Sequence, residues 1–139
     1  KKRNVLSLQV LQRLAELQHR IANDRLGIRV VVLQSTGPVF SSGHDFADFI
    51  PSVPRQVQQQ TLQLCSSVSV GFRKLPQPVV ASVQGLATAG GCQLACACDL
   101  VIASRNAAFR VPGAAGGGFC HTPGVALAQK VHPRKALEL

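Results

Sequence analysis

Apolar residues recur at helical spacing in two long segments of the chain. Within 8–22 the apolar positions include Leu8, Leu11 and Ile21, and Ser7 stands where an N-cap residue belongs. Within 54–75 the same periodicity runs until the "PQP" sequence that follows it. We therefore predict amphipathic helices over 8–22 and 54–75.

Three shorter segments, 28–35, 79–85 and 99–104, are continuous apolar runs rich in β-branched residues, which is typical of buried strands in a parallel sheet. The small-residue segment 88–98 lies between the last two strands and predicts a tightly packed helix, and 122–131 predicts another. This alternation predicts an α/β fold in which helices cover a parallel sheet.

The composition is that of one globular domain, with 139 residues, 46% hydrophobic and 15% charged. No uncharged apolar run of about 18 residues occurs, so we expect no membrane span. The chain has no initiating Met, and its last residues, "RKALEL", look like the start of a helix. These features lead us to expect a piece of a longer protein.

A net charge of +9 indicates an anionic partner. Nucleic acid is not the partner we expect, because the basic residues beyond the initial "KKR" are scattered and the chain has no Tyr or Trp for base stacking. A small phosphorylated ligand explains the charge as well. Cys92, Cys96 and Cys98 lack the spacing of a zinc knuckle, so we interpret them as small core residues and expect no metal.

Two glycine-rich turns stand out as candidate chemistry. Gly90 and Gly91 open the helix predicted over 88–98, where unpaired N–H groups and the positive end of the helix dipole favour a developing oxyanion. In the loop after the strand 28–35, Gly43 permits a sharp turn that would present the amide of His44. Both turns follow parallel strands, so they should meet at one sheet edge. Close helix–sheet packing is the other explanation for these glycines.

The segments "GPVFSSGHDF" (37–46), "PQPVVASVQGLATAGGCQLACACDLVIAS" (76–104) and "KKRNVLSLQVLQRL" (1–14) resemble the crotonase, or enoyl-CoA hydratase/isomerase, superfamily. The resemblance implies a spiral of ββα units, of which 1–139 would form a partial core domain without the first strands and the C-terminal trimerisation helices. It also implies that the whole protein forms a homotrimer or hexamer, acts in fatty-acid metabolism and is mitochondrial.

By this resemblance, the amides of His44 and Gly90 would form an oxyanion hole for an acyl-CoA thioester. Coenzyme A would be part of the ligand, and no separate cofactor is implied. The remaining residues expected to line the ligand are Gly43, Asp45, Phe46, Ala47 and Gly91. We expect the side chain of His44 to lie at a surface and Asp45 to form a turn.

The sequence departs from the family's hydratases at both catalytic glutamates, because Gln93 and Gly113 stand at those positions. A glutamine cannot take a proton from water near neutral pH, and a glycine has no group to do so. Between Leu100 and Leu137 there is no Asp or Glu to replace them, and the neighbours Cys120 and His121 are the only reactive side chains in the glycine-rich loop.

Three functions remain in view. The first is an acyl-CoA-binding protein of the crotonase fold without hydratase chemistry. The second is an active isomerase or thioester hydrolase that uses other residues, because an oxyanion hole alone stabilises an enolate. The third is a basic nucleic-acid-binding module.

Overall fold

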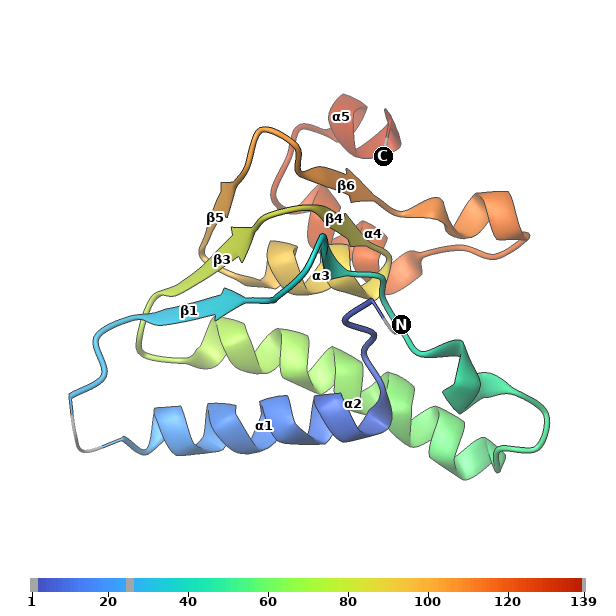
Figure 1. Cartoon of the computed structure of the whole chain (residues 1–139), viewed down its shortest axis with the longest axis horizontal. Helices are drawn as coiled ribbons and strands as arrows, with labels where there is room; N and C mark the ends of the chain where they lie inside the picture. Colours follow the sequence, from blue (N-terminus) through green and yellow to red (C-terminus); the bar gives the residue numbers. More distant parts are fainter. Residues whose placement is uncertain (1–2, 25–26, 139) are drawn as a thin grey trace.

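The computed structural model describes residues 3–24 and 27–138, which form three successive strand–strand–helix units (Figure 1). The first unit contains β1 (Val31–Gln34), β2 (Val39–Ser41) and α2 (Arg55–Lys74). The second contains β3 (Val79–Val83), β4 (Leu86–Thr88) and α3 (Gly90–Ala97), and the third contains β5 (Leu100–Ala103), β6 (Ala108–Arg110) and α4 (His121–Ala128). Helix α1 (Leu8–Ala22) precedes the units, and α5 (Pro133–Glu138) follows them.

Each unit adds one parallel strand to each of two sheets, whose strand orders are β1-β3-β5 and β2-β4-β6. In the first sheet Leu33 lies opposite Ala81, which in turn lies opposite Val101. Because the first strand of every unit joins one sheet and the second strand joins the other, the chain winds as a spiral. The predicted α/β fold of ββα units is confirmed.

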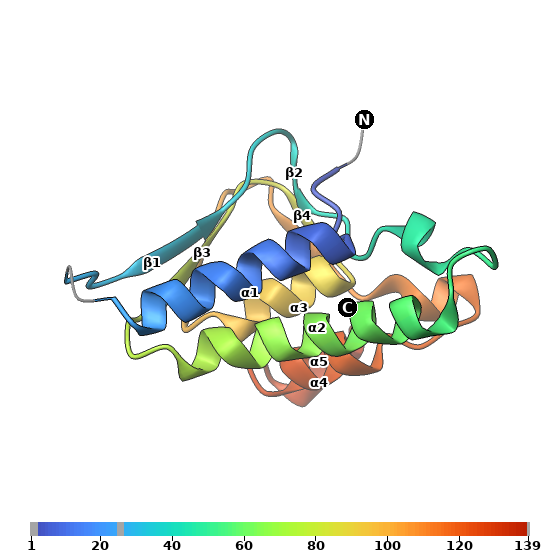
Figure 2. The ribbon, with the colours of Figure 1, turned by 90° about the horizontal axis from the view of Figure 1, so that it is seen from below.

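Helices α1 and α2 lie side by side beneath the first sheet (Figures 1 and 2). Ser7 caps α1 as predicted, because its hydroxyl accepts a hydrogen bond from the amide of Val10. Between the helices, the buried Gln18 donates to the carbonyl of Val68 over 2.7 Å. Gly71 leaves the space that this amide occupies, since a side chain there would collide with Gln18.

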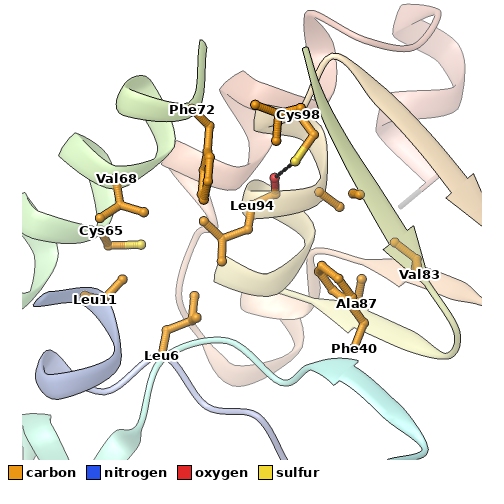
Figure 3. Close-up of a cluster of buried hydrophobic side chains, with 13 residues drawn as sticks. Leu6, Leu11, Phe40, Cys65, Val68, Phe72, Val83, Ala87, Leu94 and Cys98 are labelled. Atoms are coloured by element: carbon orange, nitrogen blue, oxygen red, sulfur yellow. Dashed lines mark hydrogen bonds between the residues drawn. The ribbon is translucent and has the colours of Figure 1, made fainter. Parts of the chain in front are cut away.

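Helix α3 runs through the centre of the molecule, and all eight of its residues are buried. Figure 3 shows Leu94 of α3 facing Phe72 and Val68 of α2, with Leu11 of α1 in the same cluster. The helix predicted over 88–98 is therefore confirmed, although it begins only at Gly90. Its small residues let two sheets and three other helices pack around it.

The prediction that all three long strands are buried was wrong for two of them. Strand β1 begins at Val31 and alternates between half-buried and exposed residues, and all four residues of β5 are exposed. Both strands are edges of the sheet, because β3 lies between them and is paired with a strand on each side. The residues of β3 are accordingly buried or half-buried. The apolar composition of 99–104 indicated a strand but not its place in the sheet.

The three-residue strands β2, β4 and β6 were not predicted, since they are too short to show a period of two. Two 3-10 turns, η1 (Phe46–Phe49) and η2 (Pro112–Gly116), protrude at the same end of the molecule in both views (Figures 1 and 2). In the part of the chain that the structure describes, no helix is long and apolar enough to cross a membrane.

Candidate functional site

The turn after β2 is fixed by the segment that precedes α1. Gly43 has a φ of 83°, a conformation that a side chain would strain, as the sequence predicted. The amide of Leu6 donates to the Gly43 carbonyl over 2.8 Å, and Leu6 forms a parallel bridge with His44. In such a bridge the backbone groups of the residue opposite point the other way. The amide of His44 therefore faces away from Leu6.

The first turn of α3 begins at a strained residue. Ala89 caps the helix with φ 49° and ψ −121°, a conformation that a residue with a side chain rarely adopts. Its amide donates to the carbonyl of Arg110 over 2.9 Å. The first helical hydrogen bond runs from Gln93 to Ala89, so the amides of Gly90 and Gly91 have no acceptor within the helix.

These two glycine turns touch each other through their backbones. A methyl group on Gly43 would lie 3.0 Å from the Ala89 Cβ and 3.2 Å from the amide nitrogen of Gly90. A methyl group on Gly91 would lie 2.5 Å from the carbonyl oxygen of Ser41. The structure thus brings His44 and Gly90 together, as the sequence predicted from the ends of parallel strands.

The side chain of His44 is half-buried and lines the cleft, so it is less open than the surface position that we expected. Its ring packs edge-on against Phe49, with centroids 5.7 Å apart, and a methyl group on Gly90 would be 3.3 Å from its Nδ1. Its Nε2 is buried and finds no hydrogen-bond partner among the described residues. Burial lowers the pKa of His44, and the carboxylate of Asp48 opposes that shift.

A cleft of about 520 Å³ lies beside the contact between the two glycine turns, since His44 lines it. The protruding turns η1 and η2 lie together at one end of the molecule (Figure 2). The lining of the cleft includes His44, His121 and Thr122, together with residues of α2 such as Leu62 and Cys65. Burial raises the pKa of the Cys65 thiol to about 11, so this thiol is neutral at pH 7. Among the described residues, the lining of the cleft offers two imidazoles and several hydroxyl groups but no carboxylate.

Gln93 has both ends of its side-chain amide engaged. It is 4% exposed, its Nε2 donates to the Ser69 hydroxyl over 3.2 Å, and its Oε1 accepts from the Thr122 hydroxyl over 2.9 Å. These bonds connect α3 to α2 and α4. Gln93 thus acts as a structural tie between three helices, a role that the sequence did not reveal.

Gly113 lies in η2, packed against Cys120. Its amide donates to the Cys120 Sγ over 3.2 Å, and a methyl group on Gly113 would lie 2.8 Å from both the Sγ and the amide nitrogen of Cys120. A larger residue at the second hydratase position would therefore displace the loop. The Cys120 thiol is turned to Gly113, while His121 lines the cleft, so the two neighbours do not form a nucleophile–base pair there.

The three residues after His44 are placed differently from one another. Asp45 is 8% exposed, and its carboxylate caps η1 by accepting from the Ala47 amide over 3.2 Å, which confirms its turn-forming role. Ala47 is exposed, and Phe46 is 84% exposed at the start of the protruding turn η1. Their contribution to ligand binding stays a prediction.

Cys92 and Cys96 pack in a small core cluster against α4, and Cys98 packs in the main core, which confirms their interpretation as small core residues. Within residues 3–24 and 27–138, no group of His, Cys, Asp or Glu could hold a metal ion.

Ser69 and Thr122 were not predicted from the sequence as partners of Gln93. Their hydrogen bonds to Gln93 join segments far apart in the chain and leave no local pattern in the sequence.

The family model described as "Enoyl-CoA hydratase/isomerase" matches residues 1–139. The chain is 44% identical over 141 residues to the human protein "Enoyl-CoA hydratase domain-containing protein 3, mitochondrial", an alignment that covers 100% of this chain and 46% of the relative. The chain thus spans about half the length of this relative.

Two solved structures show the same arrangement. The crystal structure of human enoyl-CoA hydratase domain-containing protein 3 is 45% identical, with a TM-score of 0.88 over 99% of this chain and 54% of the other. The crystal structure of an enoyl-CoA hydratase from Mycobacterium smegmatis is 40% identical, with a TM-score of 0.89 over 96% of this chain and 52% of the other.

The glycine contact predicts an unequal response to added methyl groups. Gly91→Ala should lower the free energy of unfolding by at least about 2 kcal/mol, because its methyl group would meet the fixed backbone of Ser41. Gly90→Ala should change it by less than about 1 kcal/mol, because its neighbours are side chains that can shift. Urea unfolding of both variants tests this, with Gly116→Ala, which meets no atom within 4 Å, as the control. Equal losses at Gly90 and Gly91 would contradict the contact described.

The buried ring of His44 predicts a dependence of stability on pH. Because its pKa in the folded protein lies below the ordinary value of about 6.5, the unfolded chain takes up this proton first. The contribution of the neutral His44 ring to the free energy of unfolding is complete above pH 6.5. It is lost as the pH falls through the pKa of His44 in the folded protein. Unfolding in urea at about pH 7.5 and about pH 5.5 should show the difference, and it should shrink in His44→Gln.

The exposed His132 provides the control, as His132→Gln removes an imidazole from the surface. A nuclear magnetic resonance titration in which the His44 ring takes up its proton above pH 6.5 would contradict the prediction.

Proposed function

The chain belongs to the enoyl-CoA hydratase/isomerase family, and from this premise we propose that it binds an acyl-CoA thioester without hydrating it. The amides of His44 and Gly90 hold the thioester oxygen. The acyl group lies in the cleft of about 520 Å³ beside them.

The observation that carries this proposal is the backbone contact between the two glycine turns. Gly43 and Gly90 approach within van der Waals distance, and the Gly90 amide belongs to the unpaired first turn of α3. Two donors from separate elements, close together and beside a cleft, are the arrangement that stabilises an enolate or tetrahedral oxyanion. The strained Ala89, which positions Gly90, is consistent with a functional site.

The absence of hydration follows from the other polar groups. The Gln93 amide is held by Ser69 and Thr122, and it has no proton-accepting group for water at neutral pH. Gly113 contributes no side chain, and Cys120 occupies the space beside it. No carboxylate among the described residues lines the cleft.

The wider setting is proposed by analogy with the relatives. Asp45, Phe46 and Ala47 border the path of the pantetheine and adenine groups, and coenzyme A enters as part of the ligand. The names of the relatives include "mitochondrial" and "Enoyl-CoA hydratase", so we propose that the protein acts in mitochondrial fatty-acid metabolism. The family also leads us to propose a homotrimer or hexamer.

Thioester binding can be tested with a non-reactive thioether analogue of butyryl-CoA and with a labelled thioester. We expect the analogue to bind in a calorimetric titration, and the infrared band of a 13C-labelled thioester carbonyl to shift to lower frequency when bound. Gly90→Val should weaken binding at least about tenfold at temperatures where melting curves show a folded protein. Gly116→Val, in open space, is the matched control.

The proposal fails if the folded parent protein does not bind the analogue. It also fails if the carbonyl band stays where it is in water, because the amides would then not contact the oxygen. If Gly90→Val binds like the parent while it melts much lower, the glycines serve packing alone.

The missing carboxylates predict the outcome of a hydration assay. Loss of absorbance from crotonyl-CoA should not exceed the rate without protein, because each absent acid–base group accounts for about 100- to 10,000-fold. Gln93→Glu together with Gly113→Glu should restore little, since Cys120 blocks the second carboxylate unless η2 moves. Turnover by the parent chain at the rate of an ordinary hydratase would contradict this.

A further inference from the structure

A second hollow, of about 210 Å³, lies beside the cleft and extends along α3 as far as Ala97. It lies between α2, α3 and α4, and it shares Ser66 and Thr122 with the cleft. Gln93 lines it at the point where its amide meets Thr122. The hollow and the cleft thus share part of their lining, and Gln93 borders the hollow beside the shared Thr122.

The walls of the hollow suit a short chain of methylene groups. Val70 of α2, Ala97 of α3 and Val125 of α4 contribute apolar side chains. From Gly90, at the first turn of α3, to Ala97, at its end, the helix rises about 10 Å. The hollow thus ends a short acyl chain's length from the amide that we propose as a thioester contact.

The far end of the hollow is positively charged. Arg73, in the last turn of α2, lines it and donates to the neutral side chain of Gln129 over 2.6 Å. A hydrogen bond from Cys92 and the positive charges of Lys130 and Arg73 lower the pKa of Cys96 in the neighbouring helix α3.

No acidic side chain among the described residues lines the hollow. The carboxylate of Asp99, in the turn after α3, accepts from the amide of Val79 and so faces β3 instead. Among the described residues, the guanidinium of Arg73 is thus hydrogen-bonded to a neutral amide at the far end of an apolar space. Such a cation favours an anion, and a guanidinium matches the planar shape of a carboxylate.

We propose that the hollow receives the far end of the acyl group and that this end is a carboxylate, so that the ligand is a coenzyme A monothioester of a short dicarboxylic acid. Arg73 binds the carboxylate, and the apolar walls hold the methylene groups between the two ends. The inference rests on the proposed function, because it takes the thioester to lie at His44 and Gly90.

The test compares two non-reactive thioether analogues of coenzyme A with chains of equal length, one ending in a carboxylate and the other in a methyl group. In calorimetric titrations of the protein, the carboxylate analogue should bind about tenfold or more tightly than the methyl analogue. This preference should decrease as the salt concentration rises, because the hollow is open to solvent and salt screens the attraction between Arg73 and the carboxylate.

Arg73→Met keeps the apolar stem of the side chain and removes its charge. It should abolish the preference by weakening the carboxylate analogue about tenfold, and it should leave the methyl analogue unchanged. Lys74→Met is the matched control, because Lys74 is the next cation on the same helix and does not line the hollow. It should keep the preference.

The outcomes separate this inference from the proposed function. If both analogues bind the parent equally well, the thioester site stands and the carboxylate site is wrong. If Arg73→Met weakens both analogues to the same extent, Arg73 supports the helices rather than the ligand, and the inference is overturned. If neither analogue binds, the proposed function itself fails.

Discussion

The backbone contact between the turn after β2 and the first turn of α3 is the constraint on which the rest of the site depends. It requires side-chain-free positions on both sides, because a methyl group at Gly91 would meet the Ser41 carbonyl and one at Gly43 would meet Ala89 and Gly90. Both turns leave the same sheet, since β2 and β4 are neighbouring parallel strands in it and lead directly into the two turns. The contact therefore brings two amides to one place without any polar side chain.

The close contact between the two turns is accompanied by two unfavourable features, backbone strain at Ala89 and a buried imidazole nitrogen of His44. Ala89 adopts a positive φ, which costs of order 1–3 kcal/mol, and the buried Nε2 of His44 finds no partner among the residues that the structure describes. The N-terminal segment opposes the strain: Leu6 bonds to Gly43, and Asn4 donates to the carbonyls of Thr36 and Val39. The site is thus held from the outside by residues far away in the sequence.

Around this contact, polar side chains serve the architecture more than the chemistry. The Gln93 amide ties α3 to Ser69 and Thr122, and it is almost fully buried, so its two hydrogen bonds are needed for stability. Arg73 is different, because among the described residues its side-chain hydrogen bond goes to the neutral Gln129 and it lines an apolar hollow. This difference between satisfied and unsatisfied polar groups separates structural ties from candidate ligand contacts.

The sequence by itself determined the helices, the parallel α/β order and the two glycine turns, because each depends on local periodicity or on glycine's backbone freedom. It also predicted that both hydratase carboxylates are absent, because Gln93 and Gly113 stand where the resemblance expects them. Tertiary structure alone decided that β5 is an exposed edge, that the ring of His44 turns inward onto Phe49, and that Gln93 meets Thr122. These features depend on which distant segments lie together, and the spacing of residues along the chain carries no record of such contacts.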